Sequence, residues 1–374
     1  MAVYLTLTVL VVLLGIFADN RAAVQHHISP NARTLRYGGV TRGQALTWVA
    51  CAAVFVLLAG VSACRIAVGN DYWVYREQFT WIMHNNRQVS YEFGFRLSVW
   101  IIQSIFGYDN YLAVFGVFSI VTCYFFVRSL YDQCRWMAAG IFLLMTGGYY
   151  FSSLNSVRYY FVLAIAMYAM KYVLRKEYGK FILWICFAAC FHKSILVVIP
   201  VYLAAGWLSE RKLPRWTYPA AGVFVASLLL FPEFYRRIIF TFYPYYENSV
   251  FDNGDVSYTN IAKAVGAILL ALLFYRQTVR EDRQNRFYLL LNVMGLITYA
   301  FASFIPEISR IGYYFIVSQV FLLPGILADI PQKRVRRFFI VCVGLAFTAY
   351  FGLFLRDAWD VNVRLLPYLN WIFN

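Results

Sequence analysis

The sequence has few charged residues. Lys, Arg, Asp and Glu make up 14% of its 374 residues, whereas a soluble domain carries roughly a quarter. Apolar residues make up 61% and fall in long runs, and the mean hydropathy is +0.60. A helix needs about 20 apolar residues to cross the hydrocarbon core of a bilayer, and runs of that kind recur along the whole chain. The sequence therefore predicts one integral membrane domain over residues 1–374 and no soluble domain.

Acidic residues are scarcer than basic ones, and the net charge is +15. Such a surplus is also found in nucleic-acid-binding proteins, but here the basic residues sit in short loops between apolar runs. The positive-inside rule produces that pattern, and anionic lipids add to the attraction. We therefore expect the lipid bilayer as a partner and no nucleic acid.

Cysteine motifs are absent as well. None of the seven cysteines forms a CxxC pair, and no spacing is typical of metal ligands. Most of the cysteines lie within or beside apolar runs, as small buried side chains do. We expect neither a metal nor a cofactor.

The first apolar run lacks the basic segment that precedes the core of a signal peptide. Ala2 to Ala18 is apolar, and the arginines follow it, at positions 21, 33, 36 and 42. This order predicts an uncleaved helix whose N-terminus lies outside.

The apolar runs predict an all-α polytopic protein with about 10–12 transmembrane helices. A shorter segment, 93–107, contains Arg96 and is expected to be interfacial or re-entrant on the outer side. The predicted spans are 2–18, 45–63, 110–127, 136–151, 158–174, 216–232, 261–275, 287–305, 311–328 and 338–355.

The apolar segment 181–205 decides the topology. If it crossed once, the arginine-rich and lysine-rich loops at 206–215, 276–286 and 331–337 would all lie outside, against the positive-inside rule. We therefore predict a broken re-entrant hairpin with His192 near its tip. Non-helical backbone at membrane depth is tolerated where it lines a protein-buried or watery cavity, so a cavity is expected here.

With this topology the two long outer-face loops are 64–109 and 233–260. They carry acidic and aromatic residues, whereas the inner loops are short and basic. Exposed loops on a rigid scaffold commonly carry function. We therefore expect the functional site to face the outer side of the membrane.

Four ionisable side chains, Arg158, His192, Lys193 and Arg310, fall at membrane depth, where they are costly and often functional. The two arginines either snorkel to the outer interface or clamp a diphosphate through paired donors. His192 is either a hydrogen-bonded core residue or a proton acceptor or donor near the reaction centre. Lys193 is expected to snorkel or to anchor the hairpin.

The outer loop 64–109 combines carboxylates with tyrosines. It contains Arg65, the run Gly69-Asn-Asp71-Tyr-Trp-Val-Tyr75 and, later, Glu92-Phe-Gly-Phe. A carboxylate can accept hydrogen bonds from sugar hydroxyls or act as a general base, and tyrosine rings stack on sugars. A solvated loop with interfacial aromatic residues is the structural alternative.

These residues resemble the EpsG-like family of exopolysaccharide proteins, which is related to Wzy polysaccharide polymerases. The family pattern has an arginine and G-x-D-x-x-x-Y after the second span, then E-x-G-aromatic. It continues with N-x-x-R-Q, F-H-x-S and a late arginine followed by tyrosines. The corresponding residues here are Arg65, Gly69, Asp71, Tyr75, Glu92, Gly94, Asn155, Arg158, Phe191, His192, Ser194, Arg310, Tyr313 and Tyr314. Tyr159 stands where the family has glutamine, and the resemblance runs from about residue 50 to about residue 330.

The resemblance implies a metal-independent glycosyltransferase with a GT-C-like fold. Its donor and acceptor would be undecaprenyl-diphosphate-linked oligosaccharides, and a chain-length regulator and a flippase are candidate partners. We expect Glu92, His192 and Asp71 as catalytic residues. The expected substrate-binding residues are Arg65, Tyr75, Arg158, Arg310, Asn155 and Tyr314.

Other functions stay open at this point. A lipid-linked sugar flippase would need a polar path into the cytoplasmic half, and the polar residues cluster toward the outside instead. An acyltransferase would favour a His–Asp dyad, and His192 stands alone. Addition of single sugars from a polyprenyl-phosphate donor is not distinguished from polymerisation.

Overall fold

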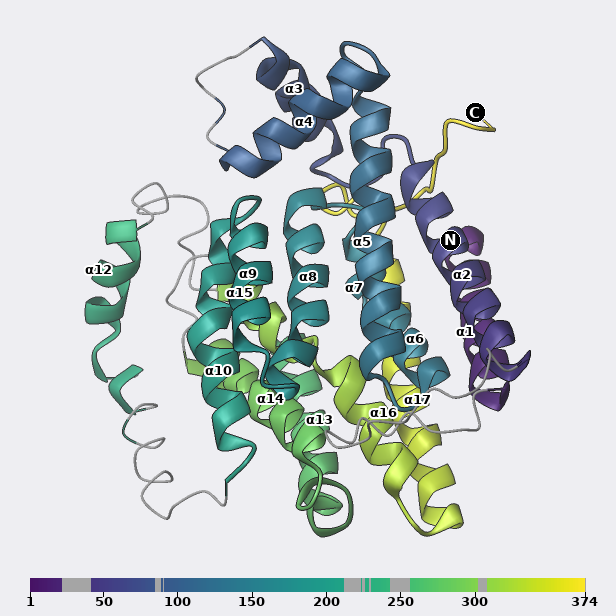
Figure 1. The fold of residues 1–374 in the computed structure, drawn as a ribbon, viewed down its shortest axis with the longest axis vertical. Helices are drawn as coiled ribbons and strands as arrows, with labels where there is room; N and C mark the ends of the chain where they lie inside the picture. The colour runs from purple at the N-terminus through teal and green to yellow at the C-terminus, as the bar shows by residue number, and fades with distance from the viewer. Residues whose placement is uncertain are drawn as a thin grey trace. The chain divides into compact units, whose positions relative to one another are not determined.

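The chain folds as an assembly of helices in the computed structural model (Figure 1). The structure describes residues 1–21, 42–84, 89, 91–211, 223, 226–228, 230–242, 256–301 and 308–373. Within these residues there is no strand, only an isolated antiparallel bridge between Arg65 and Asn370. The all-α prediction is confirmed.

Six helical segments among the described residues are long and apolar enough to cross a membrane. Five further apolar helices have 10–17 residues. The protein is therefore polytopic, as predicted, and the expected total of about 10–12 spans counts shorter helices as well. The six segments are Ala2–Asp19, Gln44–Ala63, Tyr111–Gln133, Val157–Leu174, Arg310–Asp329 and Lys333–Asp357.

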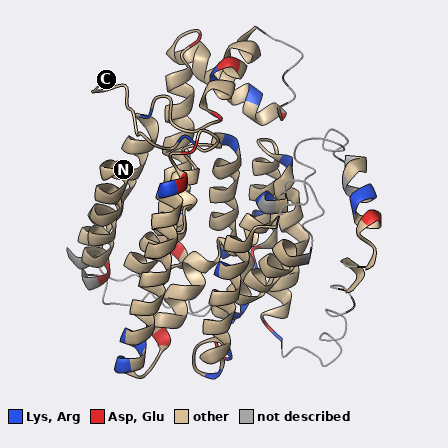
Figure 2. Cartoon of the chain, turned by 180° about the vertical axis from the view of Figure 1, so that it is seen from behind, with Lys and Arg blue, Asp and Glu red and all other residues tan. Residues whose placement is uncertain are grey.

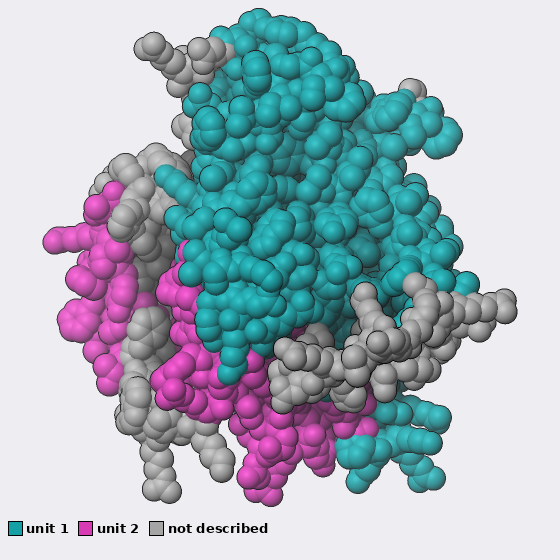
Figure 3. All heavy atoms as spheres, viewed as in Figure 1, with its two compact units in different colours: residues 1–196, 331–374 teal, residues 197–330 magenta. Residues whose placement is uncertain are grey.

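The chain divides into two compact units, coloured separately in Figure 3. Unit 1 comprises residues 1–196 and 331–374, and unit 2 comprises residues 197–330. Membrane-length helices occur in both units. The prediction of one integral membrane domain stays a prediction.

Unit 1 is organised around two long helices, α5 (Tyr111–Gln133) and α8 (Val157–Leu174), which pack against each other. Most side chains of α8 are buried all round the helix, as expected of a helix that is apolar on every face. The neighbouring helices are α1 (Ala2–Arg21), α2 (Arg42–Ala63), α3 (Tyr72–Met83), α4 (Phe93–Phe106), α6 (Met137–Thr146), α7 (Tyr149–Ser152), α9 (Tyr178–Ala189) and α17 (Lys333–Asp357).

One end of unit 1 gathers the C-terminal tail, residues 358–373, and is called the tail end below. The Tyr4 hydroxyl donates to the Leu365 carbonyl at 2.7 Å, so the start of α1 lies here. The amides of Gly69 and Asn70 donate to the tail carbonyls of Arg364 and Val363 at 2.7 and 3.1 Å. The loop after α2 is therefore held by the tail.

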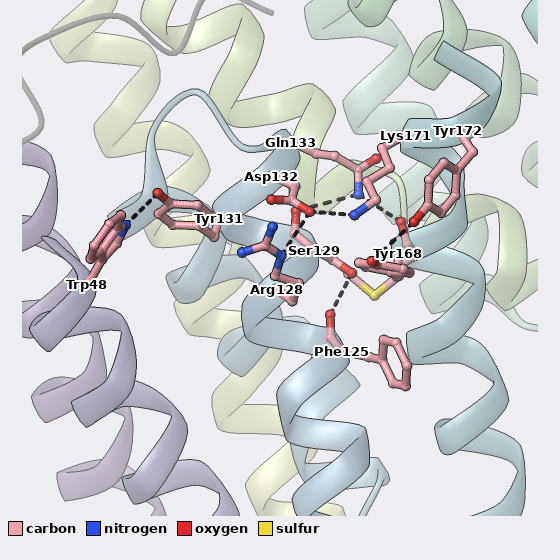
Figure 4. Close-up of polar contacts among 11 residues, drawn as sticks. Trp48, Phe125, Arg128, Ser129, Tyr131, Asp132, Gln133, Tyr168, Lys171 and Tyr172 are labelled. Atoms are coloured by element: carbon pink, nitrogen blue, oxygen red, sulfur yellow. Dashed lines mark hydrogen bonds and ion pairs between the residues drawn. The ribbon is translucent and has the colours of Figure 1, made fainter. Parts of the chain in front are cut away.

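The opposite end of unit 1 is held by buried polar contacts (Figure 4). The Lys171 ammonium of α8 lies 2.6 Å from the Asp132 carboxylate of α5, and Arg128 lies 3.1 Å from the same oxygen. Lys171 also lies 3.5 Å from the centroid of the Tyr168 ring. These contacts tie the last turn of α5 to the last turn of α8, and we call this the basic end.

Basic residues outnumber acidic ones at the basic end, where α17 begins (Figure 2). α17 has 25 residues and is about 37 Å long, and its C-terminus joins the tail. Its first turns therefore lie at the far end from the tail. The basic residues of this end are Arg128, Arg135, Arg175, Lys176, Lys180, Lys333, Arg334, Arg336 and Arg337.

Unit 2 is organised around α14 (Arg283–Phe301), which contacts α10 (Val198–Leu208), α13 (Tyr258–Leu273), α15 (Ile308–Ile316) and α16 (Gln319–Asp329). Its core includes Ala264, Tyr299 and Ile316. A π-helix, Tyr275–Val279, follows α13, and α12 spans Pro232–Phe242. The Arg286 side chain donates to the Ser209 carbonyl at 2.7 Å, which ties the end of α10 to the start of α14.

The predicted break in segment 181–205 is confirmed. α9 ends at Ala189, a 3₁₀ helix covers Lys193–Val197, and α10 starts at Val198. The predicted span 311–328 is also two helices, because α15 ends at Ile316 and α16 starts at Gln319. The predicted span 216–232 and most of the loop 233–260 lie outside the described residues.

Candidate functional site

Arg158 and Glu92 form an ion pair at the tail end of unit 1. Arg158 stands in the first turn of α8, and Glu92 immediately precedes α4. The Nη1 group donates to Oε2 of Glu92, and the two side chains are 15% and 17% exposed. The pair is therefore largely withdrawn from solvent, where a charge is stable only with a partner. The two residues are 66 positions apart in the chain and meet here. The prediction that both lie on the outer face needs them on the same side of the helices.

The second oxygen of Glu92 reaches the break after α9. Oε1 accepts a hydrogen bond from the Lys193 amide at 3.1 Å. The amides of Gly94 and Phe95 donate to the Cys190 carbonyl at 2.8 and 3.3 Å. A Cβ on Gly94 would lie 2.7 Å from the Cys190 Cβ, so glycine permits this approach. Three predicted motif regions, around Glu92, Arg158 and His192, are thereby joined.

Asp71 docks on the start of α8 beside this pair. Ser156 donates to its Oδ2 at 2.5 Å, and the Asp71 amide donates to Oδ1 of Asn155 at 2.9 Å. Gly69 has φ +94°, and a Cβ there would lie 2.8 Å from the Asn155 Cα. The loop thus needs glycine for both conformation and contact. No other partner of the Asp71 carboxylate occurs among the described residues.

Asp71, Glu92 and Ser156 share an unusual local role. Each is the N-cap residue of a helix, α3, α4 and α8 respectively, and none makes a capping hydrogen bond. Capping is the usual function of such side chains at this position. Their polar atoms are directed at one another's segments instead, and the positive end of the α8 dipole favours the nearby carboxylates.

Aromatic rings support the charged pair. The Arg158 guanidinium carbon lies 4.0 Å from the centroid of the Tyr91 ring and 5.7 Å from that of Phe95. Tyr75 is buried against Tyr91, Phe95, Phe79 and Phe115. The structure therefore places Tyr75 in the aromatic support behind the charged pair.

His192 lies next to this group, in the break between α9 and the 3₁₀ helix. Its Nδ1 is 2.8 Å from the Ser194 hydroxyl, and its ring meets Tyr159 edge-on at 5.8 Å. The side chain is 9% exposed. Serine and histidine of the F-H-x-S motif thus contact each other, and Tyr159 packs against the histidine.

Arg65 is buried between α2 and α5, and its side-chain hydrogen bonds are with these helices and not with Glu92 or Arg158. Its guanidinium donates to the carbonyl of Ser62 and, at 2.7 Å, to the hydroxyl of Ser119, and it lies 5.0 Å from the Phe115 ring centroid. Only 1% of its surface is exposed. These contacts join the end of α2 to α5, and the predicted substrate contact of Arg65 stays a prediction.

Arg310 and Tyr314 belong to unit 2, in the short helix α15. Arg310 is half-buried, and Tyr314 is fully buried with its carbonyl accepting from the Tyr202 hydroxyl. The Lys263 ammonium lies 5.5 Å from the ring centroid of the neighbouring Tyr313. Unit 2 thus holds two basic side chains near one end of α15.

A family model described as the EpsG family matches residues 48–370. The chain belongs to the EpsG family. EpsG is a family of Wzy-type polymerase-like proteins. The comparisons find no matching curated protein and no matching solved structure. The EpsG-family resemblance predicted from the motifs is confirmed, and the match covers every predicted site residue.

Several residues of this EpsG-family site were missed by sequence reasoning. Tyr91 stacks on Arg158, Ser156 binds Asp71, and the Lys193 amide binds Glu92. Tyr91 and Ser156 each adjoin a predicted residue, so adjacency was the available signal. The Lys193 amide could not be predicted from the sequence, because every residue except proline has a backbone amide.

The site of this EpsG-family chain offers carboxylates, a guanidinium, an imidazole and hydroxyls. Among the residues that the structure describes, no group of three or more His, Cys, Asp or Glu side chains is placed to hold a metal ion. The chemistry available to these side chains is proton transfer, anion binding and hydrogen bonding to hydroxyl groups.

Proposed function

We propose that this protein polymerises undecaprenyl-diphosphate-linked oligosaccharide units into a surface polysaccharide. A hydroxyl of the acceptor unit attacks the anomeric carbon of the donor chain. The bond from that carbon to the diphosphate breaks, and the hydroxyl proton passes to a base. The diphosphate is already a good leaving group, so positioning and charge stabilisation are the main requirements.

The contact of Glu92 with both Arg158 and the Lys193 amide carries this proposal. It brings an anion-binding side chain, a carboxylate and the histidine segment to one end of a membrane-spanning helix bundle. That combination suits a substrate with a charged diphosphate next to a neutral sugar. Membership of the EpsG family supports the same class of reaction.

Asp71 is the carboxylate that we assign as the base. Both oxygens of Glu92 already accept hydrogen bonds, from Arg158 and from the Lys193 amide. Asp71 accepts one, from Ser156, and has an oxygen left for a substrate hydroxyl. Glu92 then has the part of holding Arg158 in position. His192, beside Ser194, contributes a hydrogen bond near the reaction centre.

Arg158 of unit 1 is the proposed ligand of the diphosphate. Arg158 has donors beyond the one that binds Glu92, and its Nε is buried without a hydrogen-bond partner among the described residues. The guanidinium can therefore donate hydrogen bonds to phosphate oxygens while it keeps its hydrogen bond to Glu92. Arg310, in unit 2, stays a predicted substrate-binding residue. Asn155, Tyr75 and Tyr314 act through the segments that they support.

The charge distribution supports a site that faces the periplasm or cell exterior. Basic residues cluster at the basic end of unit 1, which the positive-inside rule places in the cytoplasm. The tail end, with Asp71 and Glu92, then faces outward. A bacterial inner membrane supplies undecaprenyl diphosphate carriers on that face, and a flippase and a chain-length regulator are the proposed partners.

The test is a gene deletion in the host, with lipid-linked and surface glycans separated on a gel. We expect single repeat units to remain and the polymer ladder to disappear. Wild type should restore the ladder, whereas Arg158→Ala, compared at a matched protein level in the membrane, should fail. Arg96→Ala is a matched control, because Arg96 is an exposed arginine on α4.

The other outcomes identify rival functions. A ladder that persists but lacks a sugar branch shows a transferase that adds single sugars. Loss of both the ladder and the outward-facing repeat units shows a flippase. If Arg158→Ala polymerises normally, the diphosphate assignment is wrong.

A further inference from the structure

Tyr91 has a hydroxyl that the function proposed above does not use. The residue directly precedes Glu92 and is partly exposed. Its hydroxyl has no hydrogen-bond partner among the residues that the structure describes. Polar groups that are partly buried usually have partners, from the protein, water or a ligand. A phenol can both donate and accept, so it is suited to a ligand that does the same.

The Tyr91 ring is held in one orientation by its neighbours. Arg158 covers one face, with its guanidinium carbon 4.0 Å from the ring centroid. Phe95 meets the ring at right angles, with the centroids 5.3 Å apart, and Tyr75 lies 6.2 Å away. The hydroxyl position is therefore fixed before a ligand arrives, which reduces the entropy cost of binding.

The charges around the hydroxyl select among ligands. Burial raises the pKa of Tyr91 most, the neighbouring Tyr75, Asp71 and Glu92 raise that pKa further, and Arg158 lowers it. The phenol therefore keeps its proton and remains a donor at neutral pH. The carboxylates of Asp71 and Glu92 near the Tyr91 hydroxyl favour a neutral ligand rich in hydroxyls at that atom, whereas the donors for an anion belong to Arg158.

We propose that Tyr91 is a sugar-binding residue, whose hydroxyl bonds a sugar hydroxyl while Asp71 accepts from a neighbouring one. The identity of the sugar as part of a lipid-linked oligosaccharide rests on the proposed function. In such a substrate the first sugar ring is attached to the diphosphate. A sugar position on Tyr91 beside a phosphate position on Arg158 matches that arrangement.

The test is a binding measurement on the purified full-length protein in nanodiscs. The probes are an oligosaccharide released from the host's own polysaccharide and, separately, inorganic pyrophosphate. Tyr91→Phe keeps the ring under Arg158 and removes only the hydroxyl. We expect it to weaken oligosaccharide binding about 5–10-fold, the effect of one hydrogen bond, and to leave pyrophosphate binding unchanged.

Tyr108→Phe is the matched control, because Tyr108 is an exposed tyrosine next to α4 whose hydroxyl lies 3.3 Å from His84. It should bind both probes like wild type. Three results overturn the proposal: equal oligosaccharide binding by Tyr91→Phe, a loss confined to pyrophosphate, or no oligosaccharide binding by wild type. Tyrosine-dependent oligosaccharide binding in a protein whose deletion spares the ladder would refute the polymerase and leave the sugar site standing.

Discussion

The ion pair between Glu92 and Arg158 is the residue-scale feature on which the candidate site depends. Both partners are more than four-fifths buried. Removing one partner of such a pair leaves a charge without compensation, which is strongly destabilising. The pair therefore contributes to stability as well as to the site, and the two contributions can be measured separately.

A double-mutant cycle measures the stability contribution. Glu92→Gln and Arg158→Gln should each lower the thermal unfolding temperature in detergent. The double variant should lose less than the sum, with a coupling energy of about 1–3 kcal/mol, because it contains no unpaired charge. Polymerisation should nevertheless stay lost in the double variant, since the anion-binding group is gone.

The exposed pair Arg356 and Asp357 is the control for this cycle. Their side chains are 73% and 58% exposed, and such pairs contribute about 0–1 kcal/mol. Arg356→Gln and Asp357→Asn should be additive within error. Additive losses at Glu92 and Arg158 as well would show that the two side chains do not interact in the folded protein.

At this scale the sequence predicts which residues share one end of the unit better than it predicts their contacts. Asp71, Glu92, Asn155, Arg158 and His192 were expected on one face, and they lie at one end of unit 1. The support beneath them follows from backbone shape. Gly94 is required because α4 starts against the Cys190 carbonyl, and that approach exists only after the chain has folded.

At the scale of elements, the C-terminal tail has a definite task. The carbonyls of Val363, Arg364 and Leu369 accept from the amides of Asn70, Gly69 and Ile66. These amides belong to the loop that carries Asp71. The tail is therefore a clamp on the loop between α2 and α3.

Truncation after Ala358 tests the clamp. We expect the amides of residues 66–70 to exchange hydrogen much faster, because they lose their acceptors. Polymerisation should fall while the helices remain inserted, since α17 ends before the deleted segment. Hydrogen–deuterium exchange and the glycan gel are the measurements.

Truncation after Trp371 is the matched control for the clamp. Of the residues it removes, Ile372 and Phe373 donate their amides to Oδ1 of Asn370 within the tail. Exchange at residues 66–70 should match wild type in this variant. If the longer truncation leaves those amides equally protected, the loop holds its shape without the tail.

Long apolar elements were predictable, and so was the separate segment 93–107, which is α4 (Phe93–Phe106). The predicted span 158–174 is α8 almost to the residue. α3 was missed, although Tyr72, Tyr75, Phe79 and Ile82 recur on one helical face and are buried. Polar residues between them concealed the period. The division of the predicted span 311–328 into two helices was not predictable either. At the junction the Ser318 hydroxyl donates to the Phe315 carbonyl and accepts from the Asn292 amide, and the second contact forms only in the folded chain.

At the scale of the whole molecule, charge decides orientation. Loops far apart in the sequence meet at the tail end, so their shared side was predictable from the alternation of spans. The side itself rests on the positive-inside rule, an average over many loops. A direct measurement of sidedness therefore tests the topology and the proposed location of the site together.

Cysteine labelling supplies that measurement. The starting variant has all seven cysteines replaced. Glu77→Cys then places a thiol on the exposed face of α3 at the tail end, and Lys176→Cys places one at the basic end. A membrane-impermeant maleimide applied to spheroplasts should label position 77 at once and position 176 only after the membrane is permeabilised. The reverse result would put Asp71 and Glu92 in the cytoplasm. Polymerisation at the outer face would then be impossible, whereas the contacts within unit 1 would be unaffected. Labelling of both positions in intact spheroplasts would show that unit 1 does not span the membrane between its two ends.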